Sequence, residues 1–280
     1  MPSESAWGAV GLTVRLAGRP VLDAVTIDIP RGQVTAVVGG DGAGKTSLLG
    51  ALAGRVPIAD GTVTMPPKDE VGFQPSATGV WHDLTVDENV EFVGSAYGMS
   101  SKLLSDRKEL LLGPAGLGNV GDRLGGQLSG GMRHKLGFCL AVLPRPRVLL
   151  LDEPSTGVDP VSRVELWRMV AEAAAAGTAV LLSTTYLDEA ERAHRVLALE
   201  DGVVLGFGTP DEVISSIPGS ITTEQIRPAG PESERAWRRG NIFRVWNPSA
   251  QPHRNGLPDL EDAVIALMLA RAEQRGSGND

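Results

Sequence analysis

One glycine-rich segment constrains the fold of this 280-residue chain more than any other feature. It matches the pattern G-x-x-x-x-G-K-[ST] and runs Gly39-Gly40-Asp41-Gly42-Ala43-Gly44-Lys45-Thr46. An apolar run at 34–38 precedes it and is typical of a buried strand, and a helix is expected from Lys45 to Ala53. In such a unit, glycines allow backbone N–H groups to converge on phosphate oxygens, and the helix N-terminus adds partial positive charge. The segment therefore predicts a nucleotide-phosphate site.

Two pairs of polar residues complete the predicted site. Lys45 is expected to reach the β- and γ-phosphates, while the Thr46 hydroxyl ligates Mg²⁺ and Ser47 lies beside it. Asp152 and Glu153 directly follow a leucine-rich apolar run, at the carboxyl end of a second predicted strand. Asp152 is expected to hold the Mg²⁺ shell, and Glu153 to polarise the attacking water.

The pattern of apolar runs predicts an α/β fold. Runs at 34–38, 148–151, 179–182 and 196–199 are short, apolar and bounded by glycine, proline or charge, which is typical of parallel strands buried on both faces. Helical segments lie between them, and one is expected from Pro160 to Ala176, with Asp159 as its N-cap. We therefore expect a P-loop fold built on a mostly parallel sheet.

Other regions depart from this alternation. Residues 5–33 alternate in hydropathy and predict antiparallel strands, whereas 77–146 appear mostly helical and predict an inserted subdomain. Beyond Pro210 the composition changes, and we expect a small β-rich appendage closed by a helix over about 260–272. The predicted division is a nucleotide-binding domain at 5–210 and an appendage at 211–280.

Composition narrows the classes of partner. The net charge of −8 disfavours nucleic acid, which normally selects a basic surface. A single cysteine, Cys139, excludes an internal disulfide framework, and the four histidines have no metal-ligand spacing. No apolar run approaches the ~18 residues of a membrane span, and the first residues lack the features of a signal peptide. Any membrane-spanning part is therefore expected from another chain.

A third motif makes the family resemblance specific. The order of the glycine-rich loop, Leu128-Ser129-Gly130-Gly131-Met132 and Asp152-Glu153 resembles the ATP-binding cassette (ABC) transporter ATPases. This resemblance implies ATP and Mg²⁺ as cofactors. It also implies two ATPase domains packed head to tail, each ATP lying between one P-loop and the opposite signature motif. By the same resemblance Ser129, Gly130 and Gly131 face the partner's nucleotide, and Asp159 lies in the loop that crosses to the partner's P-loop.

Features of the sequence support and refine this resemblance. Ser129 is expected to cap a helix, and the basic residues Arg133, His134 and Lys135 in its first turn favour a docked polyanion, because cations oppose the dipole there. Segments at 162–167, 186–191 and 258–263 resemble the drug, antibiotic and lipid export branch. That branch implies a membrane-spanning permease subunit and a peripheral location at the cytoplasmic face of the cell membrane. The appendage is then regulatory or serves dimerisation.

Three positions depart from the family pattern. The aromatic residue expected against adenine is Leu16, the glutamine that senses Mg²⁺ and water is Ser76, and the switch histidine is Thr185. A threonine hydroxyl can hydrogen-bond a phosphate, but it cannot present an imidazole. Gln74 lies two residues before Ser76 and is expected on the same side if the segment is a strand end.

These losses favour an asymmetric interpretation. The chain holds ATP at a partly degenerate site and completes the site of a different ATPase chain with its signature motif; the alternative is a homodimer that hydrolyses ATP at both sites. A soluble cassette protein acting on ribosomes or DNA, and a regulatory protein without nucleotide, are further possibilities that the sequence disfavours. A groove over 76–91, including Trp81, His82 and Asp83, is expected to receive a short helix of the permease.

Overall fold

The computed structural model describes residues 6–250 and 258–277. Ser5, at the predicted start of the first domain, and His253 lie outside the described residues. The main sheet has six strands in the order β5-β6-β7-β3-β8-β9. Five are parallel, and β9 pairs antiparallel with β8 at one edge. Their bounds are β3 Val34–Val38, β5 Val71–Gln74, β6 Val148–Asp152, β7 Ala179–Thr184, β8 Arg195–Glu200 and β9 Val203–Gly208. The predicted α/β fold with a mostly parallel sheet is thus confirmed.

The central strands are apolar because both of their faces are covered. Every residue of β3, β6 and β7 is buried. Within β6, Leu149 and Leu151 face the side covered by α4 (Gly130–Val142) and α5 (Pro160–Ala175), whereas Val148 and Leu150 face α1 (Lys45–Leu52). This alternation follows from the two-residue period of a strand.

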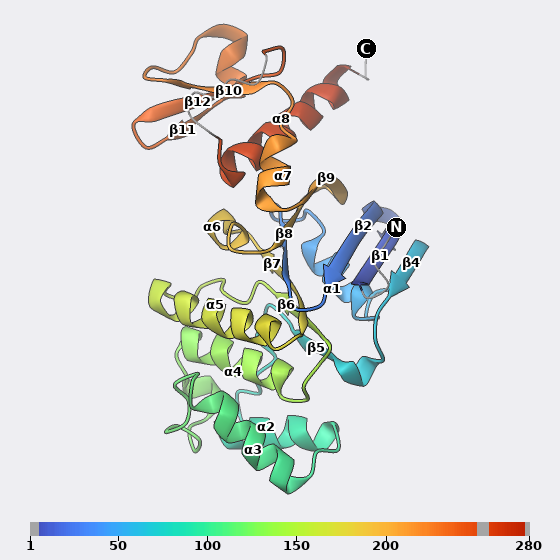
Figure 1. Ribbon diagram of the computed structural model, residues 1–280, viewed down its shortest axis with the longest axis vertical. Coiled ribbons are helices and arrows are strands. Elements are labelled where there is room, and N and C mark those ends of the chain that lie inside the picture. Colours follow the sequence, from blue (N-terminus) through green and yellow to red (C-terminus); the bar gives the residue numbers. More distant parts are fainter. Residues whose placement is uncertain (1–5, 251–257, 278–280) are drawn as a thin grey trace.

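Residues 6–30 form the predicted antiparallel strands. A second sheet has the order β2-β1-β4, with bounds β1 Ala6–Leu16, β2 Arg19–Pro30 and β4 Asp60–Thr64. The buried residues of this sheet pack with α1, so that α1 is enclosed between the two sheets (Figure 1).

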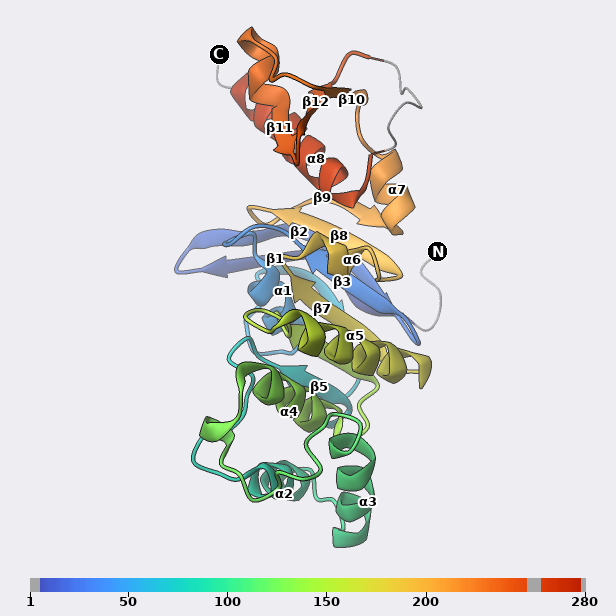
Figure 2. The ribbon, with the colours of Figure 1, turned by 90° about the vertical axis from the view of Figure 1, so that its left-hand side faces the viewer.

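The region at 77–146 connects β5 to β6 and is largely helical. Its helices are α2 Val86–Ala96, α3 Ser101–Leu112 and α4, with a 3₁₀ turn η2 at Gly125–Gln127. A further 3₁₀ turn, η1, precedes β5 at Lys68–Glu70. α2 and α3 lie at the end of the molecule opposite α8 (Leu260–Ser277), whereas α4 packs beside α5 over the sheet (Figures 1 and 2). All three helices contribute buried residues to the main apolar cluster, and α4 is the one that packs over the sheet.

The described residues beyond β9, 209–250 and 258–277, form a small sheet with three helical segments. The strands have the order β10-β12-β11, with bounds β10 Ser220–Glu224, β11 Ala236–Arg239 and β12 Ile242–Asn247. The helical segments are α7 Pro210–Ser215, η3 Gly230–Arg235 and α8. Helix α8 extends past the predicted residue 272, and Arg275 in its last turns binds Asp201 at 2.8 Å. A remaining short helix, α6, spans Leu187–Ala190.

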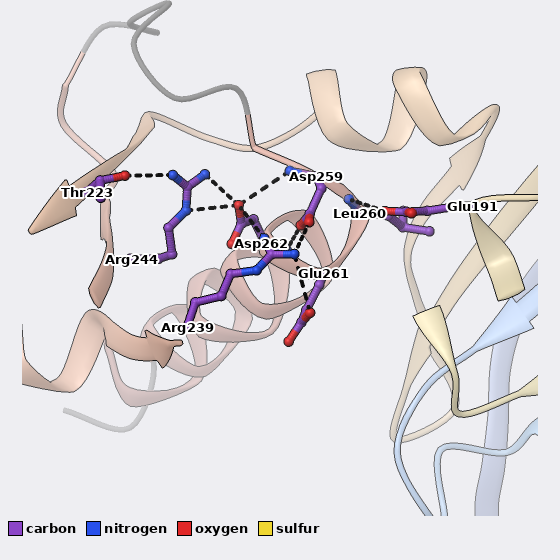
Figure 3. Close-up of polar contacts among 8 residues, drawn as sticks. All are labelled: Glu191, Thr223, Arg239, Arg244, Asp259, Leu260, Glu261 and Asp262. Atoms are coloured by element: carbon purple, nitrogen blue, oxygen red, sulfur yellow. Dashed lines mark hydrogen bonds and ion pairs between the residues drawn. The ribbon is translucent and has the colours of Figure 1, made fainter. Parts of the chain in front are cut away.

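Buried charges hold α8 against this sheet (Figure 3). Asp262 is fully buried and accepts hydrogen bonds from Arg244 Nε at 3.0 Å and Nη2 at 2.5 Å. Arg239 adds contacts to Asp259 and Glu261. The Leu260 backbone N–H meets Glu191 Oε1 at 3.4 Å, and this glutamate directly follows α6. Leu260 belongs to the same apolar cluster as β3 and α4, so α8 is also anchored in the main core.

Candidate functional site

The glycine-rich loop lies between β3 and α1, as its sequence context predicted. Gly42 and Gly44 adopt positive φ angles of 80° and 105°, which residues with a Cβ rarely adopt. A Cβ on Gly39 would lie 2.2 Å from the Leu199 carbonyl oxygen, so only glycine fits there. The loop borders a cavity of about 270 Å³. Its lining residues are Val21, Asp41, Gly42, Ala43, Gly44, Lys45, Thr46, Ser47 and Glu153.

Lys45 is held at the base of this cavity. Its Nζ donates hydrogen bonds to the carbonyl oxygens of Gly39 at 2.8 Å and Gly40 at 3.1 Å. The same nitrogen lies 3.4 Å from Glu153 Oε1. Only 5% of Lys45 is exposed, which strengthens these charge-assisted contacts. A buried cation in a glycine-rich loop at the N-terminus of a helix fits a polyphosphate.

Thr46 and Asp152 provide the oxygen ligands that Mg²⁺ prefers. Thr46 Oγ1 donates to Asp152 Oδ1 at 3.2 Å, although the two residues are far apart in sequence. Asp152 is buried at the end of β6 and also accepts a hydrogen bond of 2.7 Å from Ser183 Oγ. A hydroxyl and a carboxylate brought together beside the phosphate loop fit a hard divalent cation.

Ser183 is a functional candidate that the sequence did not reveal. Its hydroxyl donates to Asp152 and accepts from the Glu153 backbone N–H at 2.9 Å, so one side chain orders both acidic positions. Ser183 is fully buried in β7. The available signal was a hydroxyl at the end of an otherwise apolar run, because a buried polar group needs partners.

Glu153 occupies a strained backbone position. Its φ of 48° lies in the left-handed region, which is unusual for a residue with a side chain and is frequent at functional sites. The carboxylate receives a hydrogen bond from Thr156 Oγ1 at 3.2 Å, while its other oxygen faces Lys45. The side chain remains 22% exposed, so water can reach it.

The signature segment presents the N-terminus of α4. Ser129 caps this helix by accepting a hydrogen bond from the Met132 N–H at 3.2 Å, and both Ser129 and Gly130 are exposed. Gly131 is buried against α5, where an added Cβ would lie 2.6 Å from Ser162 Oγ. Hydrogen bonds from the backbone and side chain of Ser162 lower the pKa of Asp159, which caps α5 at this contact.

The basic first turn of α4 differs from expectation. Lys135 forms an ion pair with Glu165 Oε2 at 2.7 Å, and Arg133 Nη2 donates to the Leu128 carbonyl at 3.0 Å. Burial lowers the pKa of His134 below its ordinary range, so the imidazole is neutral at pH 7. Lys135 thus has a carboxylate partner within the chain and His134 carries no charge, whereas Arg133 has a neutral carbonyl partner and remains the cation of this turn that could favour a docked polyanion.

The three atypical positions lie on exposed segments. Leu16 ends β1 and is 43% exposed, Ser76 lies in the turn after β5, and Thr185 directly follows β7. The expected placement of Gln74 beside Ser76 was wrong, because β5 ends at Gln74. This side chain is fully buried, and its Nε2 donates to the His134 carbonyl at 3.2 Å.

A buried glutamate supports the segment that carries Thr185. Glu189 Oε2 accepts hydrogen bonds from Ser155 Oγ at 2.8 Å and from Thr184 Oγ1 at 2.7 Å. It thereby joins the loop after Glu153 to the end of β7. The sequence segment containing Glu189 indicated a family branch but gave no sign of this role.

The loop before α2 and the helix itself each expose one aromatic ring. Trp81 and Phe92 are 44% and 51% exposed, with ring centroids 4.5 Å apart. Buried Asn89 fixes the loop by donating to the carbonyls of Trp81, Leu84 and Thr85. Trp81 also lines a cavity of about 380 Å³ with Phe73 and Tyr97. These rings therefore form an apolar surface on a rigid support.

Comparisons with known proteins agree with this geometry. Residues 22–156 match a family model described as "ABC transporter". The probable multidrug ABC transporter ATP-binding protein YbhF of Escherichia coli (strain K12) is 39% identical over 221 residues, covering 75% of this chain and 38% of YbhF. This chain therefore spans well under half the length of that relative. The daunorubicin/doxorubicin resistance ATP-binding protein DrrA of Streptomyces peucetius is 35% identical over 236 residues, covering 80% of this chain and 71% of DrrA.

A solved structure supports the same assignment of the fold. It is titled "Structure of ATP binding subunit of ABC transporter" and shares 26% identity with this chain at a TM-score of 0.70. The superposition covers 75% of this chain and 92% of that one. Among the described residues, no helix is long and apolar enough to cross a bilayer.

Proposed function

This chain belongs to the ABC transporter family of ATP-binding proteins, and from that premise we propose that it is the ATP-binding subunit of a membrane exporter for drugs or lipids. The observation that carries the proposal is the convergence of Lys45, Thr46 and Glu153 around one cavity, with Asp152 hydrogen-bonded to Thr46. We further propose residues 5–210 as the ATPase domain and 211–280 as a regulatory or dimerisation appendage.

The proposed chemistry follows from the contacts at this cavity. Bound Mg-ATP supplies the phosphoanhydride and the cation that spreads its charge. The Lys45 ammonium offsets phosphate charge, while Thr46 Oγ1 and Asp152 hold Mg²⁺. Ser183 keeps Asp152 and the Glu153 backbone in place through two hydrogen bonds. The Glu153 carboxylate orients water and accepts its proton.

The proposed partners include a permease and a second ATPase domain. The names of YbhF and DrrA refer to a multidrug transporter and to daunorubicin/doxorubicin resistance, which supports an apolar or amphipathic cargo. The Trp81–Phe92 surface offers a permease helix an apolar contact, which supports a peripheral location at the cytoplasmic face of the cell membrane. No nucleic-acid partner is proposed.

We propose that the second ATPase domain belongs to a different chain. Leu16, Ser76 and Thr185 weaken this chain's own site, whereas the exposed Ser129 N-terminus of α4 can complete a partner's site. The alternative is a homodimer that hydrolyses ATP at both sites. The placement of Glu153 beside Lys45 favours that alternative, because the catalytic carboxylate is present and ordered.

Nucleotide titration of the purified chain tests the central proposal. Lys45→Ala should weaken Mg-ATP binding about tenfold or more, because one charge-assisted contact is lost. Lys102→Ala, at an exposed site on α3, is the matched control and should bind like the wild type. Absence of ATP binding by the wild type at millimolar nucleotide, even with its permease and partner ATPase present, would overturn the proposal.

A further inference from the structure

A second cavity lies away from the glycine-rich loop. Its volume is about 560 Å³, and it shares no lining residue with the loop cavity. Residues of α3 form one wall of the cavity, and residues of α5 and of the turn between α4 and β6 form the other. Figure 2 shows α3 on the same side of the molecule as the C-terminal end of α5. The apolar lining comprises Leu110, Leu111, Phe138, Val142, Met169 and Ala173.

One buried cation in this lining has only neutral partners. Arg107 is 8% exposed, and it donates to the carbonyl oxygens of Leu143 at 3.1 Å and Val142 at 2.7 Å. Within residues 6–250 and 258–277, no carboxylate forms an ion pair with it. Burial and the charge of Arg145 lower the pKa of Arg107. The two carbonyls end α4 and carry the partial negative charge of a helix C-terminus, which offsets part of the arginine charge. An anion placed here would offset the remainder.

The mouth of the cavity carries more positive charge. Arg31, Arg145 and Arg147 line it and are exposed. The acidic lining residue, Glu172, already forms an ion pair with Arg168 at 2.7 Å. Arg147 forms an ion pair with Glu70 at 3.1 Å. This local excess of arginine occurs on a chain whose net charge is −8.

The backbone also indicates that Arg145 has a specific role. Its φ is 58°, in the left-handed region where glycine is preferred. Glycine would adopt this φ with less backbone strain. The presence of arginine therefore indicates that its side chain has a role apart from forming the turn. Its position places a cation beside Arg107 at the cavity mouth.

From these observations we propose that the cavity binds a small organic anion with an apolar body, such as a medium-chain carboxylate. The head group lies among Arg107, Arg145 and Arg31, and the tail contacts the apolar lining. The volume and the apolar walls with a few converging polar groups are typical of a small-molecule site. Such a ligand would bridge α3 to α5, and thus the inserted helices to the core.

Calorimetric titration of the full chain with decanoate tests this proposal. We expect one decanoate per chain, and much weaker binding of decanol and decyltrimethylammonium, which share the tail but lack the negative charge. Arg145→Gly should weaken decanoate binding about tenfold or more, because a charge-assisted contact disappears. The fold should survive, since glycine adopts this φ without strain. Lys102→Ala removes a cation from α3 outside the cavity and should leave binding unchanged.

Several results would overturn the proposal. Equal binding of the three probes would show adsorption driven by the alkyl tail alone. Unchanged decanoate affinity in Arg145→Gly would remove the role of the arginine mouth. A loss of decanoate binding in Lys45→Ala would place the carboxylate in the loop cavity instead.

Discussion

Replacement of Asp262 by alanine tests whether buried charge holds the appendage in place. Asp262 is fully buried near the start of α8. Its carboxylate accepts hydrogen bonds from Arg244 Nε and Nη2 and lies 3.4 Å from Arg239 Nη1. The same carboxylate accepts from the Asp259 N–H at 3.3 Å, and the Asp262 N–H donates to Asp259 Oδ1 at 3.0 Å. Asp262→Ala thus removes a carboxylate partner of the buried Arg244 guanidinium and one of two reciprocal contacts at the start of α8.

The expected loss follows from the burial of these groups. Removing one partner of a buried ion pair costs about 3–5 kcal/mol, because the other charge stays desolvated. The lost contact at the helix start adds up to about 1 kcal/mol. If the stability of the α8 contact falls by about 4 kcal/mol, the equilibrium constant for opening of α8 rises roughly a thousandfold.

Hydrogen exchange of the α8 and β12 amides measures this opening directly. Arg275→Ala is the matched control, because the Arg275–Asp201 pair also ties α8 to the ATPase side but is 52% and 64% exposed. An exposed pair contributes about 1 kcal/mol or less. The double variant Asp262→Ala/Arg244→Met should recover much of the loss, since an apolar pair can replace a buried ion pair. If Asp262→Ala exchanges no faster than Arg275→Ala, the reasoning is refuted.

Three further predictions concern the site and its surroundings. In the assembled transporter, Ser129→Arg should abolish most ATP hydrolysis, whereas Glu153→Gln should have a much smaller effect. An equal loss of the steady-state ATPase rate in the two variants would contradict the asymmetric interpretation. Trp81→Cys should cross-link to the permease in membranes, whereas Lys102→Cys should not; labelling confined to this chain would count against the docking surface. Burial raises the pKa of the Cys139 thiol to about 12, so thiol reagents at pH 8 should modify it only in denaturant, and rapid labelling of the folded chain would disprove its burial.

Local sequence signals were sufficient for much of the fold. The apolar run at 34–38 and the glycine-rich loop predicted β3, the turn and α1, because each depends on neighbouring residues and on burial of both strand faces. Asp159 and Pro160 likewise predicted the start of α5, since capping is a local interaction. These elements are determined within a few residues of chain.

Contacts between distant segments could not be predicted in the same way. Ser183 meets Asp152 only because β6 and β7 are neighbours, and Glu189 joins two loops for the same reason. Lys135 appeared to be an exposed cation until α5 brought Glu165 beside it. Gln74 was misplaced because the end of β5 and its contact with α4 depend on tertiary packing. A single sequence carries no direct record of such pairings.

The anchoring of α8 in the main core has a consequence for synthesis of the protein. Leu260, Ala263 and Val264 belong to the same apolar cluster as Val34 and Ala36, although more than two hundred residues separate them in the chain. During translation, the first of these side chains emerge long before the last are made. The apolar cluster can therefore be completed only after residues 260–264 have left the ribosome, and until then part of its surface is open to chaperones or to aggregation.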